Sequence, residues 1–286
     1  MVAVCGAAAA SCGGSKAGPL TVGAHLETES KVIGEIVSQH IQRKLGAAIT
    51  RSFDMRSTPE SYQGLLLATL DVCPEDATSV VATVLKEQVD PDPTVGFVRA
   101  REEMARMARV LVLDPLGIER RYAMVMRTDE AKRRKVQTLS EAAKSADPWT
   151  LALTADFQSR RDGLSAFSTA YPLTQGSPPR ILRLDEAYKS LADNAVDLVS
   201  GFITDGQLED PAFTMLEDDR KAFVPGGVCL LARYESLDRD KGLREALTQL
   251  SGRMSTVQIR KMNHDVAVRR RPLADVALVF LNEAKL

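Results

Sequence analysis

The stretch "PLTVGAHLETESKVIGEIVSQHIQRKLGAAITRSFD", residues 19–54, predicts a helix between two short strands. Its apolar residues recur at the spacing of one helical face: Val32, Ile33, Ile36, Val37, Ile41 and Leu45. Gly46 follows this stripe directly and is a typical C-terminal cap. Short apolar segments, "PLTVGA" and "AAITRSFD", flank the helix. This order favours two parallel strands joined by a helix that covers one face of a sheet.

The same alternation of strands and helices continues along the chain. Further strands are expected at 71–76, 109–117, 121–127, 149–157, 180–184 and 195–203. Helices separate most of them, and the alternation restarts near residue 130. The segment "GGVCLLARYE" at 226–235 predicts a strand that returns to the first block, and the rest of the chain is helical. Two α/β blocks indicate two lobes with a cleft between them.

Composition excludes several classes of protein. The chain has 286 residues, with 37 basic and 38 acidic side chains, so it lacks the overall positive charge of a nucleic-acid-binding protein. The short basic runs "KRRK" at 132–135 and "RRR" at 269–271 are typical of solvated faces. No stretch has the roughly 18 consecutive apolar residues of a membrane-spanning helix.

The N-terminal residues 1–19 are interpreted as a leader. "MVAVCGAAAASC" is apolar and small, as in an export signal, although no basic residue precedes it. Cys12 follows Ala-Ala-Ser and precedes Gly-Gly, which resembles a bacterial lipoprotein site where the cysteine is acylated. A bystander cysteine in an Ala-rich terminus is the alternative. We expect an exported protein that is periplasmic or lipid-anchored at the outer face of the cytoplasmic membrane.

Residues that carry catalysis or metal binding form no recognisable pattern. His25, His40 and His264 have no metal-ligand spacing, and no nucleophile motif is present. His40 is expected on the helix surface, and His25 near the cleft. Cys73 and Cys229 are interpreted as small buried hydrophobic residues unless the fold brings them together. Neither a metal nor a cofactor is therefore expected.

Five segments are informative in a second way, because their sequences, order and spacing are similar to those of a known family. They are "ESKVIGEIVSQ" (29–39), "TADFQSRRDGLSAFSTAY" (154–171), "AVDLVSGFITDGQL" (195–208), "FTMLEDDRKAFVP" (213–225) and "LTQLSGRMSTVQIRKMN" (247–263). From about Leu20 to Leu286 the chain resembles the substrate-binding proteins of ABC importers for glycine betaine, choline and related quaternary amines. The resemblance implies a small ligand, a permease with its ATPase as partners, and a monomeric receptor.

The resemblance also implies a fold and its division. The type II periplasmic-binding-protein fold has two α/β lobes joined by two crossover strands, expected here near Tyr122–Arg127 and Gly227–Arg233. Lobe I would comprise residues 20–125 and 229–286, and lobe II residues 126–228.

In this family, aromatic rings form a cage around the onium group, because their electron-rich faces attract a cation. The resemblance places Asp76 at one cage tyrosine and Gly226 at another, so two of four rings are replaced. Tyr122 and Phe202 retain the other two. A half-cage with the Asp76 carboxylate as counter-charge is still compatible with a cation.

The resemblance carries further ligand-contacting positions. Ser30 stands where a glutamine is expected, and Ser79 lies three residues after Asp76. Phe157, Trp149 and Tyr188 are candidate replacement rings. The expected ligand-binding set is Ser30, Asp76, Ser79, Arg120, Arg121, Tyr122, Phe157, Arg160, Phe202, Thr204 and Asp205.

The arginines bear on the ligand's charge. Arg120 and Arg121, if they enter the cleft, favour a zwitterion or acid with an anionic end over plain betaine. Arg160 is compatible with a ligand contact and with a structural tie to Asp162. Asp205, next to Thr204, is compatible with a turn as well as a contact.

Three functions remain open from the sequence. The first is a solute-binding receptor of an importer. The second is an enzyme on the same fold that uses Arg120, Arg121 and Arg160 on an anionic substrate, with a reactive Cys229. The third is a binding protein that signals through a partner.

Overall fold

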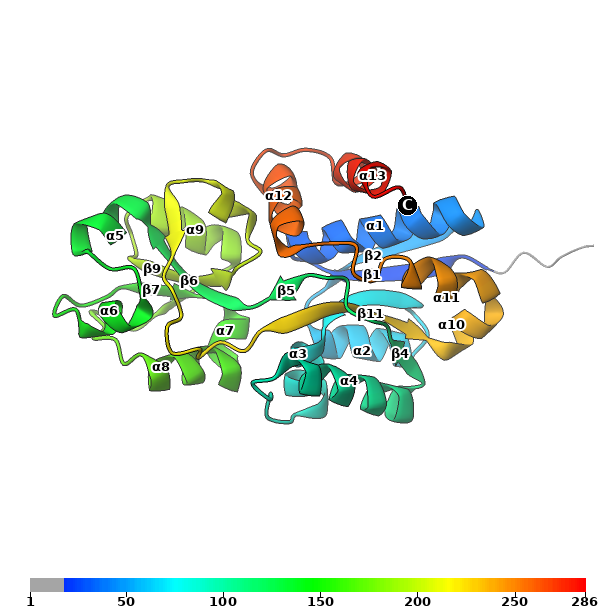
Figure 1. The fold of residues 1–286 in the computed structure, drawn as a ribbon, viewed down its shortest axis with the longest axis horizontal. Coiled ribbons are helices and arrows are strands. Elements are labelled where there is room, and N and C mark those ends of the chain that lie inside the picture. The colour runs from blue at the N-terminus through cyan, green and yellow to red at the C-terminus, as the bar shows by residue number, and fades with distance from the viewer. Residues whose placement is uncertain (1–17) are drawn as a thin grey trace, which may run out of the picture.

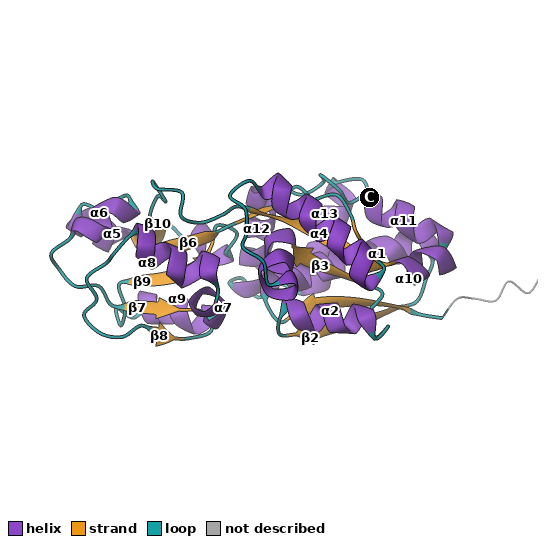
Figure 2. Cartoon of the chain, turned by 90° about the horizontal axis from the view of Figure 1, so that it is seen from below, coloured by secondary structure: helices purple, strands orange, loops and turns teal. Residues whose placement is uncertain are grey.

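The computed structural model describes residues 18–286 as two α/β lobes, each built on its own sheet (Figure 1). The predicted leader, including Cys12, lies outside the described residues. Seen from below, the two sheets occupy opposite ends of an elongated molecule, with the connecting segments between them (Figure 2). The two-lobe α/β architecture expected from the sequence is confirmed.

The lobe I sheet has the strand order β2-β1-β3-β11-β4. Its strands are β1 (Leu20–His25), β2 (Ile49–Met55), β3 (Val72–Asp76), β4 (Val110–Val112) and β11 (Gly226–Arg233). β1 is parallel to β2 and β3, whereas β11 runs antiparallel between β3 and β4. The short β5 (Glu119–Arg120) pairs with the first residues of β11. The quoted N-terminal stretch therefore forms the parallel unit that its pattern predicts.

Helices cover both faces of this sheet. They are α1 (Thr28–Leu45), α2 (Thr58–Leu66), α3 (Ala77–Ser79), a π-helix (Val80–Leu85), α4 (Pro93–Ala108), α10 (Tyr234–Arg239), α11 (Lys241–Thr248), α12 (Thr256–Ala267) and α13 (Leu273–Glu283). α1, α12 and α13 lie on one side and α2, α3 and α4 on the other (Figure 1). α1 packs against α13 and α11, so His40 is fully buried instead of exposed as expected.

The lobe II sheet has the strand order β10-β6-β9-β7-β8. Its strands are β6 (Tyr122–Arg127), β7 (Leu151–Leu153), β8 (Arg180–Ile181), β9 (Leu198–Phe202) and β10 (Phe213–Met215). The surrounding helices are α5 (Thr128–Arg134), α6 (Leu139–Lys144), α7 (Ala155–Ser159), a π-helix (Arg161–Ser165), α8 (Ala166–Ala170), α9 (Leu184–Ala192) and the 3-10 turn η3 (Gly206–Glu209).

The chain passes between the sheets twice. β5 pairs in the first sheet and β6 in the second, so the first passage falls at residue 121. The second lies between β10 and β11. Each strand expected to cross over therefore belongs to one sheet only, with Gly226–Arg233 entirely in lobe I. The passages precede the expected boundaries by a few residues, and the lobe boundaries themselves stay a prediction.

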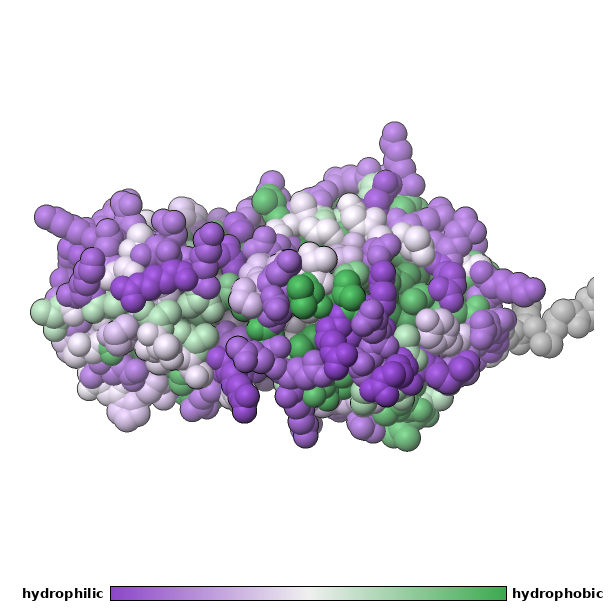
Figure 3. Space-filling view, turned by 60° about the horizontal axis from the view of Figure 1, so that its bottom comes forward, coloured by the Kyte–Doolittle hydropathy of each residue, from purple (hydrophilic) through white to green (hydrophobic). Residues whose placement is uncertain are grey.

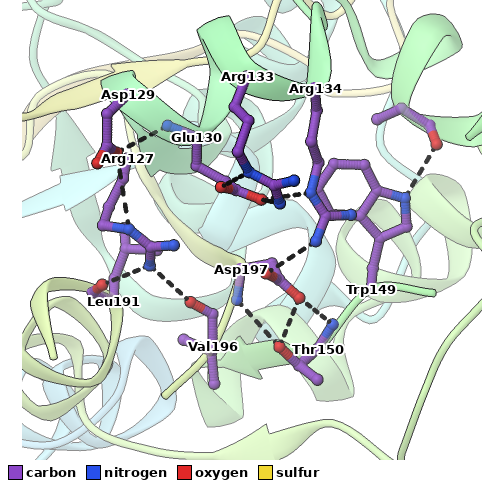
Figure 4. Close-up of polar contacts among 11 residues, drawn as sticks. Arg127, Asp129, Glu130, Arg133, Arg134, Trp149, Thr150, Leu191, Val196 and Asp197 are labelled. Carbon is purple, nitrogen blue, oxygen red and sulfur yellow. Dashed lines mark hydrogen bonds and ion pairs between the residues drawn. The ribbon is translucent and has the colours of Figure 1, made fainter. Parts of the chain in front are cut away.

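The basic run at 132–135 does not form a purely solvated face (Figure 4). The guanidinium of Arg134 stacks over Trp149 at 4.2 Å from the ring centroid. It also pairs with Glu130 at 2.5 Å and with Asp197 at 3.1 Å, with its side chain only 11% exposed. Arg133, on the same helix, is largely exposed as expected. The run therefore ties α5 to the strands of lobe II.

The outer surface is mostly hydrophilic, and hydrophobic side chains gather chiefly over lobe I (Figure 3). Exposed apolar residues there include Leu66 and Leu67 at the end of α2, and Val95, Val98 and Met107 on α4. Within residues 18–286, no helix combines the length and apolar character needed to cross a membrane.

Candidate functional site

Two adjoining cavities share Asp76 and Arg120; residues of both lobes line the first, and residues of lobe I line the second. Together with the open solvent at their mouths, the first covers about 240 Å³ and the second about 320 Å³ of space free of atoms. The first is lined by Asp76, Thr78, Ser79, Arg120, Arg121, Tyr122, Arg160, Asp162, Phe202 and Val224. The second is lined by His25, Glu27, Glu29, Ser30, Ile33, Pro74, Glu75, Asp76, Arg120 and Val228. Because β1 and β3 end here, the cavities open at the carboxyl ends of parallel strands, where α/β proteins usually bind ligands.

The two rings expected to belong to a cage, those of Tyr122 and Phe202, lie side by side in lobe II. Tyr122 of β6 and Phe202 of β9 are directly paired residues, and their rings stack at 4.8 Å with an interplanar angle of 23°. Phe157 packs edge-on against Tyr122 at 5.0 Å and is fully buried, so it supports the ring from behind and lines neither cavity. This position does not agree with a direct ligand contact.

The other candidate replacement rings are also engaged elsewhere. Trp149 is fully buried in lobe II, where its indole N–H donates to the Ala142 carbonyl. The hydroxyl of Tyr188 donates to Asp205 at 2.9 Å. Neither ring lines the two cavities. Among the described residues that line the cavities, Tyr122 and Phe202 are thus the aromatic ones.

Arg120 enters the cleft, where two carboxylates already pair with its charge. Its guanidinium lies 3.8 Å from the centroid of the Phe202 ring. It pairs with Glu27 at 2.9 Å and with Glu29 at 3.4 Å. Burial alone would lower the pKa of Arg120, but the neighbouring carboxylates raise it above its usual value, so this side chain stays charged. Glu27 and Glu29 went unrecognised in the sequence, although "ETE" at the start of α1 is an acidic signal.

Arg160 bridges the lobes. Its Nη1 donates to the Ser79 hydroxyl of lobe I at 2.6 Å, and Nε and Nη2 donate to Asp162 at 2.9 and 2.5 Å. The expected structural tie through Asp162 is present, and Arg160 also lines the first cavity. Its guanidinium lies 5.7 Å from the Tyr122 ring, whose hydroxyl donates to Asp156.

Asp76 is the one cavity carboxylate of the described residues with an unsatisfied buried oxygen. Its Oδ1 accepts hydrogen bonds from the Ser79 N–H at 2.9 Å and from the Thr78 hydroxyl. Its Oδ2 has no hydrogen-bond partner, and the residue is only 5% exposed. This oxygen lies against Gly226, where an added Cβ would approach it to 2.1 Å. Asp76 and Gly226, the two positions where the resemblance implies a missing ring, therefore adjoin.

Arg121 and Ser30 lie at the edges of the cavities. Arg121 lines the first cavity with about a third of its side chain exposed, and its Nε lies 3.2 Å from Glu119. In the second cavity, the Ser30 hydroxyl accepts the His25 N–H at 2.8 Å. The His25 ring pairs with Glu75 at 2.8 Å. Burial alone would lower the pKa of His25, but Glu75 raises it above its usual value.

Thr204 and Asp205 position the site without lining it. Asp205 Oδ2 accepts the Phe202 N–H and the Tyr188 hydroxyl, each at 2.9 Å, and burial raises the pKa of Asp205 to about 7. The Thr204 carbonyl accepts the side-chain amide of Asn263 on α12, a lobe I helix, at 2.9 Å. This loop therefore holds Phe202 in place and fixes α12 against lobe II.

The cysteines give no support to nucleophilic chemistry. Cys73 and Cys229 lie on the neighbouring strands β3 and β11 as buried free thiols. Burial raises the pKa of both thiols well above the usual value, so neither has the thiolate character of a reactive cysteine.

Comparison with known proteins agrees with this architecture. The carnitine transport binding protein OpuCC of Listeria monocytogenes is 25% identical over 273 residues, covering 95% of this chain and 88% of that protein. The glycine betaine-binding protein YehZ of Escherichia coli K12 is 23% identical, covering 93% and 91%. A crystal structure described as a glycine betaine/carnitine/choline ABC transporter superposes with a TM-score of 0.80 at 21% identity, covering 93% and 98%.

The fold, with a cavity lined by residues of both lobes, is that of the periplasmic solute-binding proteins. Residues 18–283 match the substrate-binding domain of the ABC-type glycine betaine transport system, and the chain belongs to this family. Such proteins are not enzymes; they bind small ligands and work with permease and ATPase subunits. The enzyme alternative is therefore not supported.

Proposed function

We propose that this protein captures a small zwitterionic or quaternary-amine-type solute between its lobes and delivers it to the permease of an ABC importer. The observation that carries the proposal is the mixed lining of the first cavity: Asp76 and Ser79 come from lobe I, and Tyr122, Arg160 and Phe202 from lobe II. A ligand that contacts both lobes stabilises their closed arrangement over any open one. Family membership supports the same role.

Isothermal titration calorimetry with a panel of solutes tests the proposal. The panel comprises glycine betaine, carnitine, choline, glycine and proline. We expect at least one to bind with a stoichiometry of one per chain, and at 100 times its dissociation constant to raise the unfolding free energy by about 2.7 kcal/mol. A variant with Ser79→Ala and Arg160→Ala should bind more weakly. If no solute in the panel binds, the receptor function is wrong.

The localisation completes the proposal. We expect an exported monomer that is either periplasmic or anchored to the outer face of the cytoplasmic membrane by a lipid on Cys12. Membrane fractionation and mass spectrometry test this directly: the Cys12→Ala variant should leave the membrane fraction and lose the acyl mass. Size-exclusion chromatography tests the monomer.

A further inference from the structure

We infer that the preferred solute is a zwitterion whose cationic nitrogen still carries N–H bonds, which the Asp76 carboxylate accepts, and whose anionic end lies on Arg121. This inference rests on the proposed receptor function and names the chemical class of its ligand. It differs from the binding of a fully methylated onium group, which offers no N–H to any acceptor.

The first argument concerns the aromatic rings. An onium group binds by resting on free ring faces. Here Tyr122 stacks on Phe202 at 4.8 Å, and the Arg120 guanidinium lies 3.8 Å from the same ring. Two groups at these distances leave little of the Phe202 ring free for a ligand. Arg120 is held there by Glu27 and Glu29, so an incoming onium would have to displace a paired cation.

The second argument concerns Asp76 itself. A buried carboxylate oxygen without a hydrogen-bond donor is costly, because it has given up its bonds to water without replacement. Asp76 Oδ2 is such an atom, on a residue that lines both cavities. A fully methylated nitrogen offsets only part of this cost, because it supplies charge without a donor. An ammonium supplies both, in a short charge-assisted hydrogen bond.

The third argument is the balance of charge around the cavities. Four carboxylates raise the pKa of Arg120, those of Glu27, Glu29, Asp76 and Asp156, against the effect of burial. Burial in this acidic surrounding raises the pKa of Glu29 above its usual value. One more positive charge near Asp76 is therefore favoured. Within residues 18–286, no group of three or more potential ligands is arranged for a metal ion, so an organic cation fits better.

Arg121 supplies the complementary end. Arg160 is committed to Asp162 and Ser79, and Arg120 to its acidic partners. In the described chain, Arg121 has only its Nε near a carboxylate, that of Glu119, and lines the same cavity as Asp76. Its terminal amino groups are suited to a bidentate bond with a carboxylate. A ligand with both charges then spans the cavity from Asp76 to Arg121.

The test is a methylation series measured by calorimetry on the full-length protein. The first series is glycine, sarcosine, dimethylglycine and glycine betaine; the second is proline, N-methylproline and proline betaine. We expect the last methylation, which removes the final N–H, to weaken binding at least tenfold in whichever series binds. The Asp76→Asn variant should bind N–H-bearing members at least tenfold more weakly and lose this preference. The Arg121→Gln variant should bind the zwitterions more weakly than the unaltered protein.

The outcomes separate this inference from the receptor function. If the fully methylated betaines bind as tightly as their N–H-bearing parents, the inference is wrong and the receptor function stands. If no member of either series, nor carnitine or choline, binds, the receptor function itself fails. If circular dichroism shows that the Asp76→Asn variant does not fold, the methylation series on the unaltered protein still tests whether an N–H on the ligand is preferred.

Discussion

Replacement of Gly226 by alanine tests how closely Asp76 packs against this residue. The added Cβ would lie 2.1 Å from Asp76 Oδ2 and 2.8 Å from its Cγ, far inside ordinary contact distance. Gly226 is not in the left-handed region, so the backbone itself accepts alanine. The Asp76 side chain must therefore move.

The cost follows from what Asp76 loses on moving. Its Oδ1 accepts one hydrogen bond from the Ser79 N–H and one from the Thr78 hydroxyl. A hydrogen bond to a charged group contributes about 1.5–3 kcal/mol, and partial recovery through the open cavity reduces the loss. We expect Gly226→Ala to lower the free energy of unfolding by about 2–4 kcal/mol and to weaken ligand binding.

Urea denaturation followed by circular dichroism measures the effect. Gly227→Ala is the matched control on the same strand, because its Cβ would meet only Pro115 side-chain atoms at 3.7 Å. The double variant Asp76→Ala, Gly226→Ala should lose less stability than the sum of the single variants, because the clash disappears with the carboxylate. Equal effects at 226 and 227, or strict additivity, would refute the reasoning.

Three further predictions concern stability, each measured by urea denaturation. Arg134→Ala should cost about 3 kcal/mol, because Asp197 loses its ionic partner, Glu130 keeps only Arg133 and the stacking on Trp149 is lost. The exposed neighbour Arg133→Ala should cost under about 1 kcal/mol, and similar losses for the two variants would contradict the role of the Arg134 network. Burial raises the pKa of Asp205 to about 7, so between about pH 4 and 7 the folded state keeps a proton that the unfolded state has lost. The stability that this proton contributes is therefore lost as the pH rises from about 4 through 7. Asp205→Asn should flatten this decline in the free energy of unfolding, and an unchanged slope would show that Asp205 does not cause it. Gly206→Ala places a Cβ 2.4 Å from the His264 backbone nitrogen and should destabilise the protein strongly. Gly96→Ala, with open space around it in α4, should instead stabilise the protein by up to about 1 kcal/mol. If both variants changed stability in the same direction, the described surroundings of these two glycines would be wrong.

The architecture was predictable because it follows from local patterns. The spacing of apolar residues predicted α1 and the short strands on either side of it. The family resemblance predicted how the chain is divided between two lobes. The segment around α4 was not assigned, although Asp92 caps it and Pro93 begins it, as helix starts often do. Its apolar stripe is weak because several apolar side chains, Val95 and Val98 among them, face solvent.

The candidate site was only partly predictable because it depends on pairs far apart in the chain. The sequence indicated Arg120 as a cleft residue. Its partners Glu27 and Glu29 lie over 90 positions earlier, so these ion pairs could not be predicted from the sequence. The contact between Asp76 and Gly226 likewise arises from strand pairing. Conversely, Phe157 and Asp205 carry residue types suited to a site but lie behind it, where they hold the rings in place.

The most direct test of the account is a crystal structure of the protein with its tightest-binding solute from the two methylation series. We predict that the solute's nitrogen lies within about 3 Å of Asp76 Oδ2, as a hydrogen bond requires, while Arg120 keeps its place over Phe202. A nitrogen centred on the Phe202 ring, with Arg120 displaced and Asp76 untouched, would contradict the account.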